Sequence, residues 1–110
     1  MDAKTRAKYD ARARIIKAMA HPTRLFIVDE LANHSERCVC ELTEMVGADM
    51  STVSRHLAIL KNAGIVEDDK RGLQVYYRLR VRCVTGFLEC VESVMQCNAS
   101  RHRGVLANKE

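Results

Sequence analysis

The sequence predicts a mainly helical domain that carries a single β-hairpin. Three observations lead to this class. Aliphatic residues dominate the apolar fraction, and the 110 residues include one proline and no tryptophan, which favours helices. Apolar residues recur at helical spacing along most of the chain. Apolar and polar residues alternate in the segment 73–80, directly after a short glycine-containing turn, as in a strand with one buried face.

Two helices are expected in the first third of the chain. Residues 2–20 are rich in Ala, Lys and Arg and form the first helix, which His21-Pro22 breaks. Thr23 can cap the second helix, which starts near Arg24. Its stretch RLFIVDELA is nearly continuous in apolar residues, so we expect this helix to be the buried centre of the domain.

Two shorter helices joined by a tight turn follow. One runs from about Cys38 to Val46 and ends at Gly47, and Asp49 is a suitable N-cap for the other, over residues 50–63. On a helical wheel, one side of the second of these helices is apolar and must pack inward, through Val53, Leu57 and Leu60. The opposite side presents small and basic residues, namely Ser51, Ser54, Arg55, Ala58 and Lys61.

A hairpin and a last helix complete the pattern. Strands at 65–69 and 73–80 flank the turn Lys70-Arg71-Gly72, and a helix covers about 82–97. This order is that of a winged helix-turn-helix. We therefore expect residues 1–97 to form one DNA-binding and dimerisation domain, with its N- and C-terminal helices in the dimer interface. Residues 98–110 are expected to be a basic, flexible tail.

Charge and composition restrict the classes of function that this chain can have. A net charge of +4 suits an anionic partner such as nucleic acid. The first ten residues are charged and no apolar run follows, so we expect no signal peptide, no membrane partner and a cytoplasmic protein. The histidines are scattered, so we do not expect an enzyme. An odd number of cysteines, five, indicates thiols or metal ligands rather than a disulfide framework.

The exposed side of the predicted helix 50–63 is suited to reading operator DNA. Small hydroxyl residues near its start allow close approach to the major groove, and Arg55 can reach guanine edges or phosphate. Lys61 lies farther along and more readily meets phosphate. Lys70 and Arg71, at the hairpin tip, can enter a neighbouring minor groove. The alternative is that this side is an ordinary solvated helix face. Three features argue against that alternative: the preceding helix, the turn and the basic hairpin tip.

Four motifs in order, AHPTRL, CVCEL, STVSRHLAILKNAGIV and VYYRL, together resemble the ArsR/SmtB family of metal-sensing repressors. The resemblance covers about residues 12–97. It implies a homodimeric winged-helix repressor that releases operator DNA when it binds a metal or metalloid, or when thiols are oxidised. It also implies that Ser51, Ser54 and Arg55 occupy DNA-reading positions, with Met50 and Thr52 beside them.

Cys38-Val39-Cys40 is similar to the arsenite site of arsenic repressors in that family, although Thr43 stands where a third thiol often occurs. The resemblance implies Cys38 and Cys40 as ligands for arsenite or antimonite as inducer, ahead of zinc or cadmium. Residues i and i+2 of a helix point about 200° apart, so chelation would have to unwind the first helical turn. The alternative is that Cys40 belongs to the core and Cys38 has no role.

Cys83, Cys90 and Cys97 recur every seven residues, about 10.5 Å apart along a helix, so they cannot share an ion within one chain. We interpret them as an interface stripe of small apolar residues. At the positions where zinc sensors of the family carry their ligands, this chain has Val81, Cys83, Val94 and Cys97, so a zinc sensor of that type is not expected, while a thiolate variant across the dimer stays open. Two other functions also stay open: a redox or persulfide sensor, and a DNA-binding module whose cysteines are all structural and whose partner is another protein.

Overall fold

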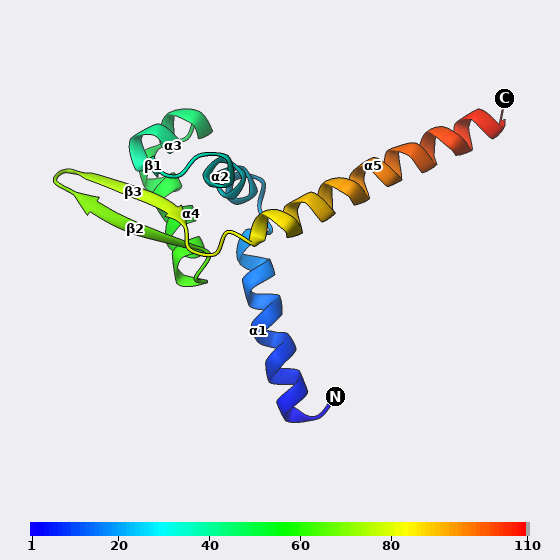
Figure 1. Cartoon of the computed structure of the whole chain (residues 1–110), viewed down its shortest axis with the longest axis horizontal. Helices are drawn as coiled ribbons and strands as arrows, with labels where there is room; N and C mark the ends of the chain where they lie inside the picture. Colours follow the sequence, from blue (N-terminus) through cyan, green and yellow to red (C-terminus); the bar gives the residue numbers. More distant parts are fainter. Residues whose placement is uncertain (110) are drawn as a thin grey trace.

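The computed structural model describes residues 1–109, with side chains described through residue 101. Five helices and three short strands form in these residues (Figure 1). The elements are α1 (Ala3–Met19), α2 (Pro22–Asn33), β1 (Arg37–Cys38), α3 (Val39–Val46), α4 (Met50–Asn62), β2 (Val66–Arg71), β3 (Gln74–Leu79) and α5 (Val84–Lys109). The predicted class, mainly helical with a hairpin wing on a helix-turn-helix, is confirmed.

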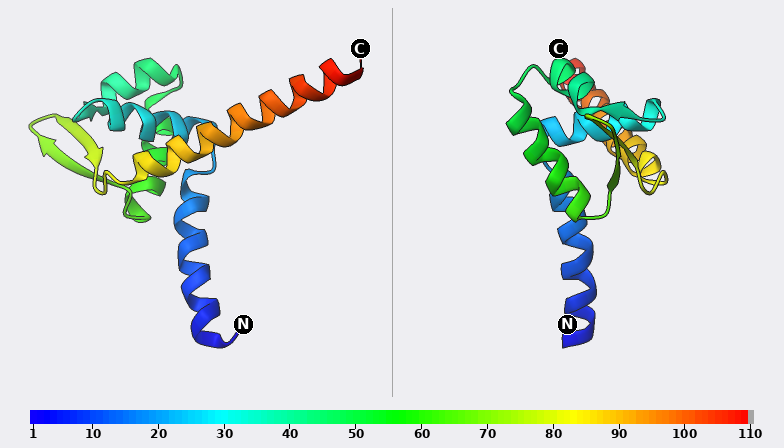
Figure 2. Two further views of the ribbon diagram at one scale, coloured as in Figure 1. Left: turned by 45° about the vertical axis from the view of Figure 1, so that its right-hand side comes forward. Right: turned by 90° about the vertical axis from the view of Figure 1, so that its left-hand side faces the viewer.

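The first and last helices extend away from the rest of the molecule. Figure 1 shows α1 and α5 leaving a body made of α2, α3, α4 and the sheet, and the turned views show that they diverge (Figure 2). The described chain measures 62 × 42 × 23 Å as a result. None of the helices in the described part of the chain is long and apolar enough to cross a membrane.

The core lies between α2, α3, α4 and the sheet. The inward side of α4 is as predicted, because Val53, Leu57 and Leu60 are fully buried. Burying such a side chain stabilises a fold by roughly 1.5–3 kcal/mol. From α2, only one face is buried, through Ile27, Val28 and Leu31. The expectation that this helix is the buried centre of the domain is confirmed for this face, whereas Leu25 and Phe26 on the rest of the helix are about two-fifths exposed.

The sheet contains a strand that the sequence pattern did not predict. Its order is β1-β3-β2, and both pairings are antiparallel. Strand β1 is only two residues long, with Arg37 opposite Tyr77 and Cys38 opposite Tyr76. So short a strand carries no alternation of its own. It ties the start of α3 directly to the wing hairpin.

Two helix starts differ from the predicted ones. His21, rather than Thr23, caps α2, because its Nδ1 accepts the N–H of Thr23 at 3.1 Å. Cys38 is the N-cap of α3 and not its first helical residue, since its backbone is extended at φ −79° and ψ 160°. Asp49 caps α4 as predicted.

The last helix is longer than predicted. It begins at Val84 and continues to Lys109, so the expected end near Cys97 is wrong. The segment 98–109 that was expected to be a flexible tail is helical in its backbone, and residue 110 lies outside the described residues. Ala, Leu, Lys and Arg in this segment are good helix formers, which accounts for the continuation.

Candidate nucleic-acid interface and thiol site

The outer face of α4 is exposed, and part of it carries no internal partner. The side chains of Ser54 and Arg55 are exposed and make no hydrogen bond or ion pair with any other described residue. Met50 is half exposed beside them. Donors without internal partners on a helix face are available to an external acceptor.

The first turn of α4 is held by its cap. The Asp49 carboxylate accepts the hydroxyls of Ser51 and Thr52, the latter at 2.6 Å, as well as the Thr52 N–H at 3.3 Å. Hydrogen bonds from these two residues lower the pKa of Asp49 to about 2. The Asp49 carboxylate therefore orients the hydroxyls of Ser51 and Thr52, which were expected to lie at or beside the DNA. The Ser54 hydroxyl has no such partner among the described residues.

The other predicted DNA-binding cations are paired with carboxylates, with one exception. Lys61 Nζ lies 3.0 Å from Asp68 Oδ2. The Arg71 guanidinium donates to both Glu36 oxygens, at 2.7 and 2.8 Å, and to Asp69 at 2.9 Å. It also lies 4.4 Å from the centre of the Tyr76 ring. The exception is Lys70, whose exposed side chain has no partner among the described residues. Lys70 and Arg71 were predicted in the hairpin turn but lie at the end of strand β2, where Lys70 pairs with Val75.

Cys38 has a structural role in the thiol pair. Its Sγ accepts the Glu41 N–H at 3.4 Å, and its own N–H donates to Glu41 Oε1 at 3.0 Å, which makes a reciprocal capping box. The side chain is only 8% exposed. Burial raises the pKa of the Cys38 thiol, which disfavours the thiolate in this conformation.

Cys40 differs from Cys38 in its exposure and in its hydrogen bond. It is exposed, and its Sγ donates to Gln74 Oε1 at 3.4 Å. The two thiols therefore do not both lie in a helix, and the premise that chelation must unwind a helical turn is wrong. Among the described residues, no three His, Cys, Asp or Glu side chains come together as a metal-binding group.

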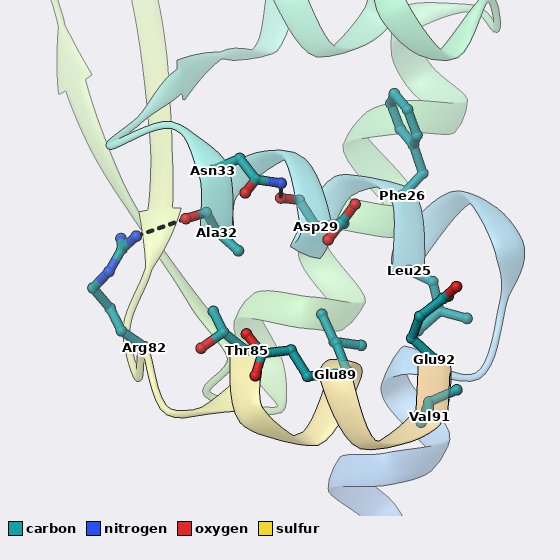
Figure 3. Close-up of a pocket in the computed structure, with 11 residues that line it drawn as sticks. Leu25, Phe26, Asp29, Ala32, Asn33, Arg82, Thr85, Glu89, Val91 and Glu92 are labelled. Carbon is teal, nitrogen blue, oxygen red and sulfur yellow. Dashed lines mark hydrogen bonds between the residues drawn. The ribbon is translucent and has the colours of Figure 1, made fainter. Parts of the chain in front are cut away.

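The three C-terminal cysteines are exposed, and Cys83 precedes α5 rather than lying on it. Beside this helix is a groove of about 740 Å³ between α2 and α5, lined by Leu25, Phe26, Asp29, Leu88 and Glu89 among others (Figure 3). At its edge Arg82 donates to the Ala32 carbonyl at 2.9 Å.

A cluster of nitrogen-containing side chains next to α4 had no clear signal in the sequence. The rings of His21 and His56 lie 4.5 Å apart between centroids, and Arg24 donates weakly to His56 Nδ1 at 3.5 Å. Burial, followed by the charges of His21, Arg24 and Arg55, lowers the pKa of His56. Residues 32 positions apart meet here, which local periodicity cannot show.

Known proteins match this arrangement. Residues 21–68 match the family model described as bacterial regulatory protein, arsR family. The chain is 30% identical over 95 residues to the arsenical resistance operon repressor of Escherichia coli, covering 86% of this chain and 81% of that one. The chain belongs to the ArsR family.

Two further similar proteins show the range of the similarity. A homodimeric winged helix-turn-helix DNA-binding domain from Mycobacterium bovis, solved by NMR, aligns with a TM-score of 0.78 and 32% identity, over 92% of this chain and 93% of that one. A cadmium resistance regulatory protein CadC homologue of Staphylococcus aureus is 39% identical over 67 residues, 61% of this chain and 55% of that one. This chain is thus an ArsR-family transcriptional regulator with a winged helix-turn-helix.

Proposed function

We propose that this protein is a transcriptional repressor that binds operator DNA as a homodimer and releases it when a thiophilic ion binds Cys38 and Cys40. The observation that carries the DNA-binding part is the outer face of α4. Its buried side is fully occupied by the core, whereas Ser54 and Arg55 are exposed without partners among the described residues. A helix of this kind enters the major groove with its N-terminal residues at the base edges.

Each predicted contact then has a distinct role. Ser51, Ser54 and Arg55 face base edges, and Met50 and Thr52 flank them. Lys70 at the wing tip meets backbone or minor groove without first breaking an ion pair. Lys61 and Arg71 exchange their carboxylate partners for phosphate, so their net contribution is smaller.

Dimerisation is proposed from the apolar side chains that the projecting helices expose. On α1 these are Tyr9, Ile15 and Ile16, each nearly half exposed. On α5 they are Phe87, Val91, Val94 and Met95, which are 42–59% exposed. Exposed apolar side chains on one helix face, as at the α5 positions 87, 91, 94 and 95, favour an interaction site. A two-fold dimer would read two half-sites one helical turn, or a multiple, apart.

The capping box at the start of α3 gives a physical reason why ion binding would change DNA binding. A thiophilic ion takes thiolates, so Cys38 must leave its buried position and stop accepting the Glu41 N–H. Its backbone also pairs with Tyr76 on β3, so the change reaches both α3 and the wing. Two thiolates suit arsenite or antimonite better than zinc or cadmium, with a small thiol or hydroxide completing the site.

Titration of the protein–operator complex with each effector tests this proposal. Arsenite and antimonite should release DNA from the wild type, and Cys38→Ser and Cys40→Ser should each bind operator without responding. A Cys83→Ser, Cys90→Ser, Cys97→Ser triple variant is the matched control and should respond like the wild type. Loss of response only in the triple variant would move the sensor to α5.

A thiol-redox or persulfide sensor of the same fold is the second candidate. The observation that favours it is the exposure of four of the five thiols, at Cys40, Cys83, Cys90 and Cys97. Exposed thiols are open to oxidation. If peroxide or persulfide releases operator DNA and arsenite does not, this function replaces the first.

A further inference from the structure

A second basic region lies where α1, α2 and α4 meet. A pocket of about 400 Å³ there is lined by Arg14 and Lys17 of α1 and Arg24 of α2, and its floor includes Ile59 and Asn62 of α4. Within the described part of the chain, no carboxylate lines it. The pocket therefore gathers three cations from two helices against the side of a third.

These cations have no carboxylate partner among the described residues, unlike Lys61, Arg71 and Arg78 around the wing. Arg14 and Lys17 make no ion pair or side-chain hydrogen bond with the described residues. The Arg24 Nε is buried without a hydrogen-bond partner among them, and the guanidinium's one side-chain hydrogen bond there is the 3.5 Å one to His56. A buried donor without an acceptor is costly, so the Arg24 guanidinium is not fully satisfied by the described residues.

The pocket continues the exposed face of α4. Ile59 and Asn62 follow Arg55 by four and seven residues, so all three lie along one side of the helix. Asn62 is about 10.5 Å beyond Arg55 along the axis. When the start of α4 occupies a major groove, the far end of the same side lies toward the groove's edge, where the phosphates are.

We propose that this pocket binds a backbone phosphate of the operator, so that the end of α1 forms part of the DNA interface. The inference rests on the proposed DNA binding. Arg14 and Lys17 supply the positive charge, and the Asn62 amide can donate beside them. A free anion such as inorganic phosphate has the same chemistry; the continuity of the pocket with the α4 face favours DNA.

The salt dependence of DNA binding tests the proposal. Each phosphate contact contributes about 0.9 to the magnitude of the slope of log K against log salt. Because the pocket holds one phosphate, Arg14→Ala with Lys17→Ala should lower that magnitude by about 0.9 for each half-site. Operator and random DNA should lose affinity by the same factor. Lys4→Ala with Lys8→Ala makes the same charge change near the other end of α1 and should leave the slope close to that of the wild type.

A second variant changes a residue of α4 that lines the pocket. Asn62→Asp puts a carboxylate beside the cations without altering α1, so it should also weaken both DNAs even if α1 has a separate role in assembly. An unchanged slope in both pocket variants, or an equal loss in the Lys4, Lys8 control, would overturn the proposal. So would saturable binding of inorganic phosphate that only the pocket variants lose while their DNA slope stays the same. A wild type that binds no DNA would overturn the proposed function as well.

Discussion

The wing and the α4 side of this protein both carry basic residues, but they differ in what those residues contact. Around the wing, Arg71 and Arg78 each lie within 3.0 Å of a carboxylate oxygen, and so does Lys61, which belongs to α4 but reaches Asp68 of β2. On the α4 side, Arg55 and the pocket cations Arg14 and Lys17 have no such partner among the described residues. A net charge of +4 does not distinguish the two regions.

The difference indicates where binding energy is available. A cation already paired with a carboxylate must give up that pair before it meets phosphate, so much of the gain is offset. An unpaired cation loses only its contacts with water when it binds phosphate. We therefore expect the affinity for DNA to depend mainly on the α4 side. The ion pairs around the wing, with Glu36, Glu67 and the two aspartates of β2, are expected to stabilise the wing itself.

The largest expected effect comes from the unpaired side. Arg55→Ala should weaken operator binding by about 1–3 kcal/mol for each base edge that the guanidinium no longer reaches, and it should relax sequence choice at that position. Fluorescence anisotropy with operator and with single-base variants of it measures both effects.

Arg78→Ala is the matched control for Arg55→Ala, because it removes the same charge from the paired region. Its affinity should stay within about twofold of the wild type, in line with the small worth of exposed ion pairs. Equal losses of affinity in the two variants would show that pairing does not decide which cations bind DNA.

This contrast also separates what the sequence predicts from what it does not. The inward side of α4, the Asp49 cap and the hairpin are encoded by local spacing, and the structure confirms them. The pairing of Arg71 with Glu36, and the meeting of Arg24 with His56, join residues 35 and 32 positions apart. Neither pair leaves a periodic signal, because each depends on how elements pack.

The geometry of the thiol pair, Cys38 and Cys40, also depends on how elements pack, although the two residues are close in the sequence. The Cys-x-Cys spacing identifies a candidate site, but its geometry depends on β1, a two-residue strand specified by its partner β3. Pairing with Tyr76 keeps Cys38 extended and buried, while Cys40, two residues later, is exposed. The sequence alone places both in one helix and so misassigns the role of Cys38.

An intermediate effect should follow from releasing a paired cation. Glu36→Gln removes the charged, two-oxygen partner of Arg71 and leaves it only Asp69. If pairing withholds Arg71 from phosphate, this variant should bind DNA more tightly at low salt and gain up to about 0.9 in salt slope.

A double-mutant cycle sharpens this prediction. Arg71→Ala should cost little in the wild-type background and more in the Glu36→Gln background, because only there is the guanidinium free. The same cost in both backgrounds would mean that Glu36 does not restrain Arg71. Asp68→Asn with Lys61→Ala forms an equivalent cycle at the other wing pair.

The smallest expected effect concerns the anion that begins α4. The folded protein holds the pKa of Asp49 at about 2, below its ordinary 3.8, so the carboxylate's contribution to stability is fully present above about pH 4 and is lost as the pH falls toward 2. Asn is also a good N-cap but does not titrate in this range. In urea unfolding followed by circular dichroism, the wild type should be the more stable of the two at about pH 5, and its advantage over Asp49→Asn should shrink between about pH 4 and 2. A constant difference across that range would show that the Ser51 and Thr52 hydroxyls do not depend on the charge of Asp49, and the orientation of the first turn of α4 would then have to come from packing alone.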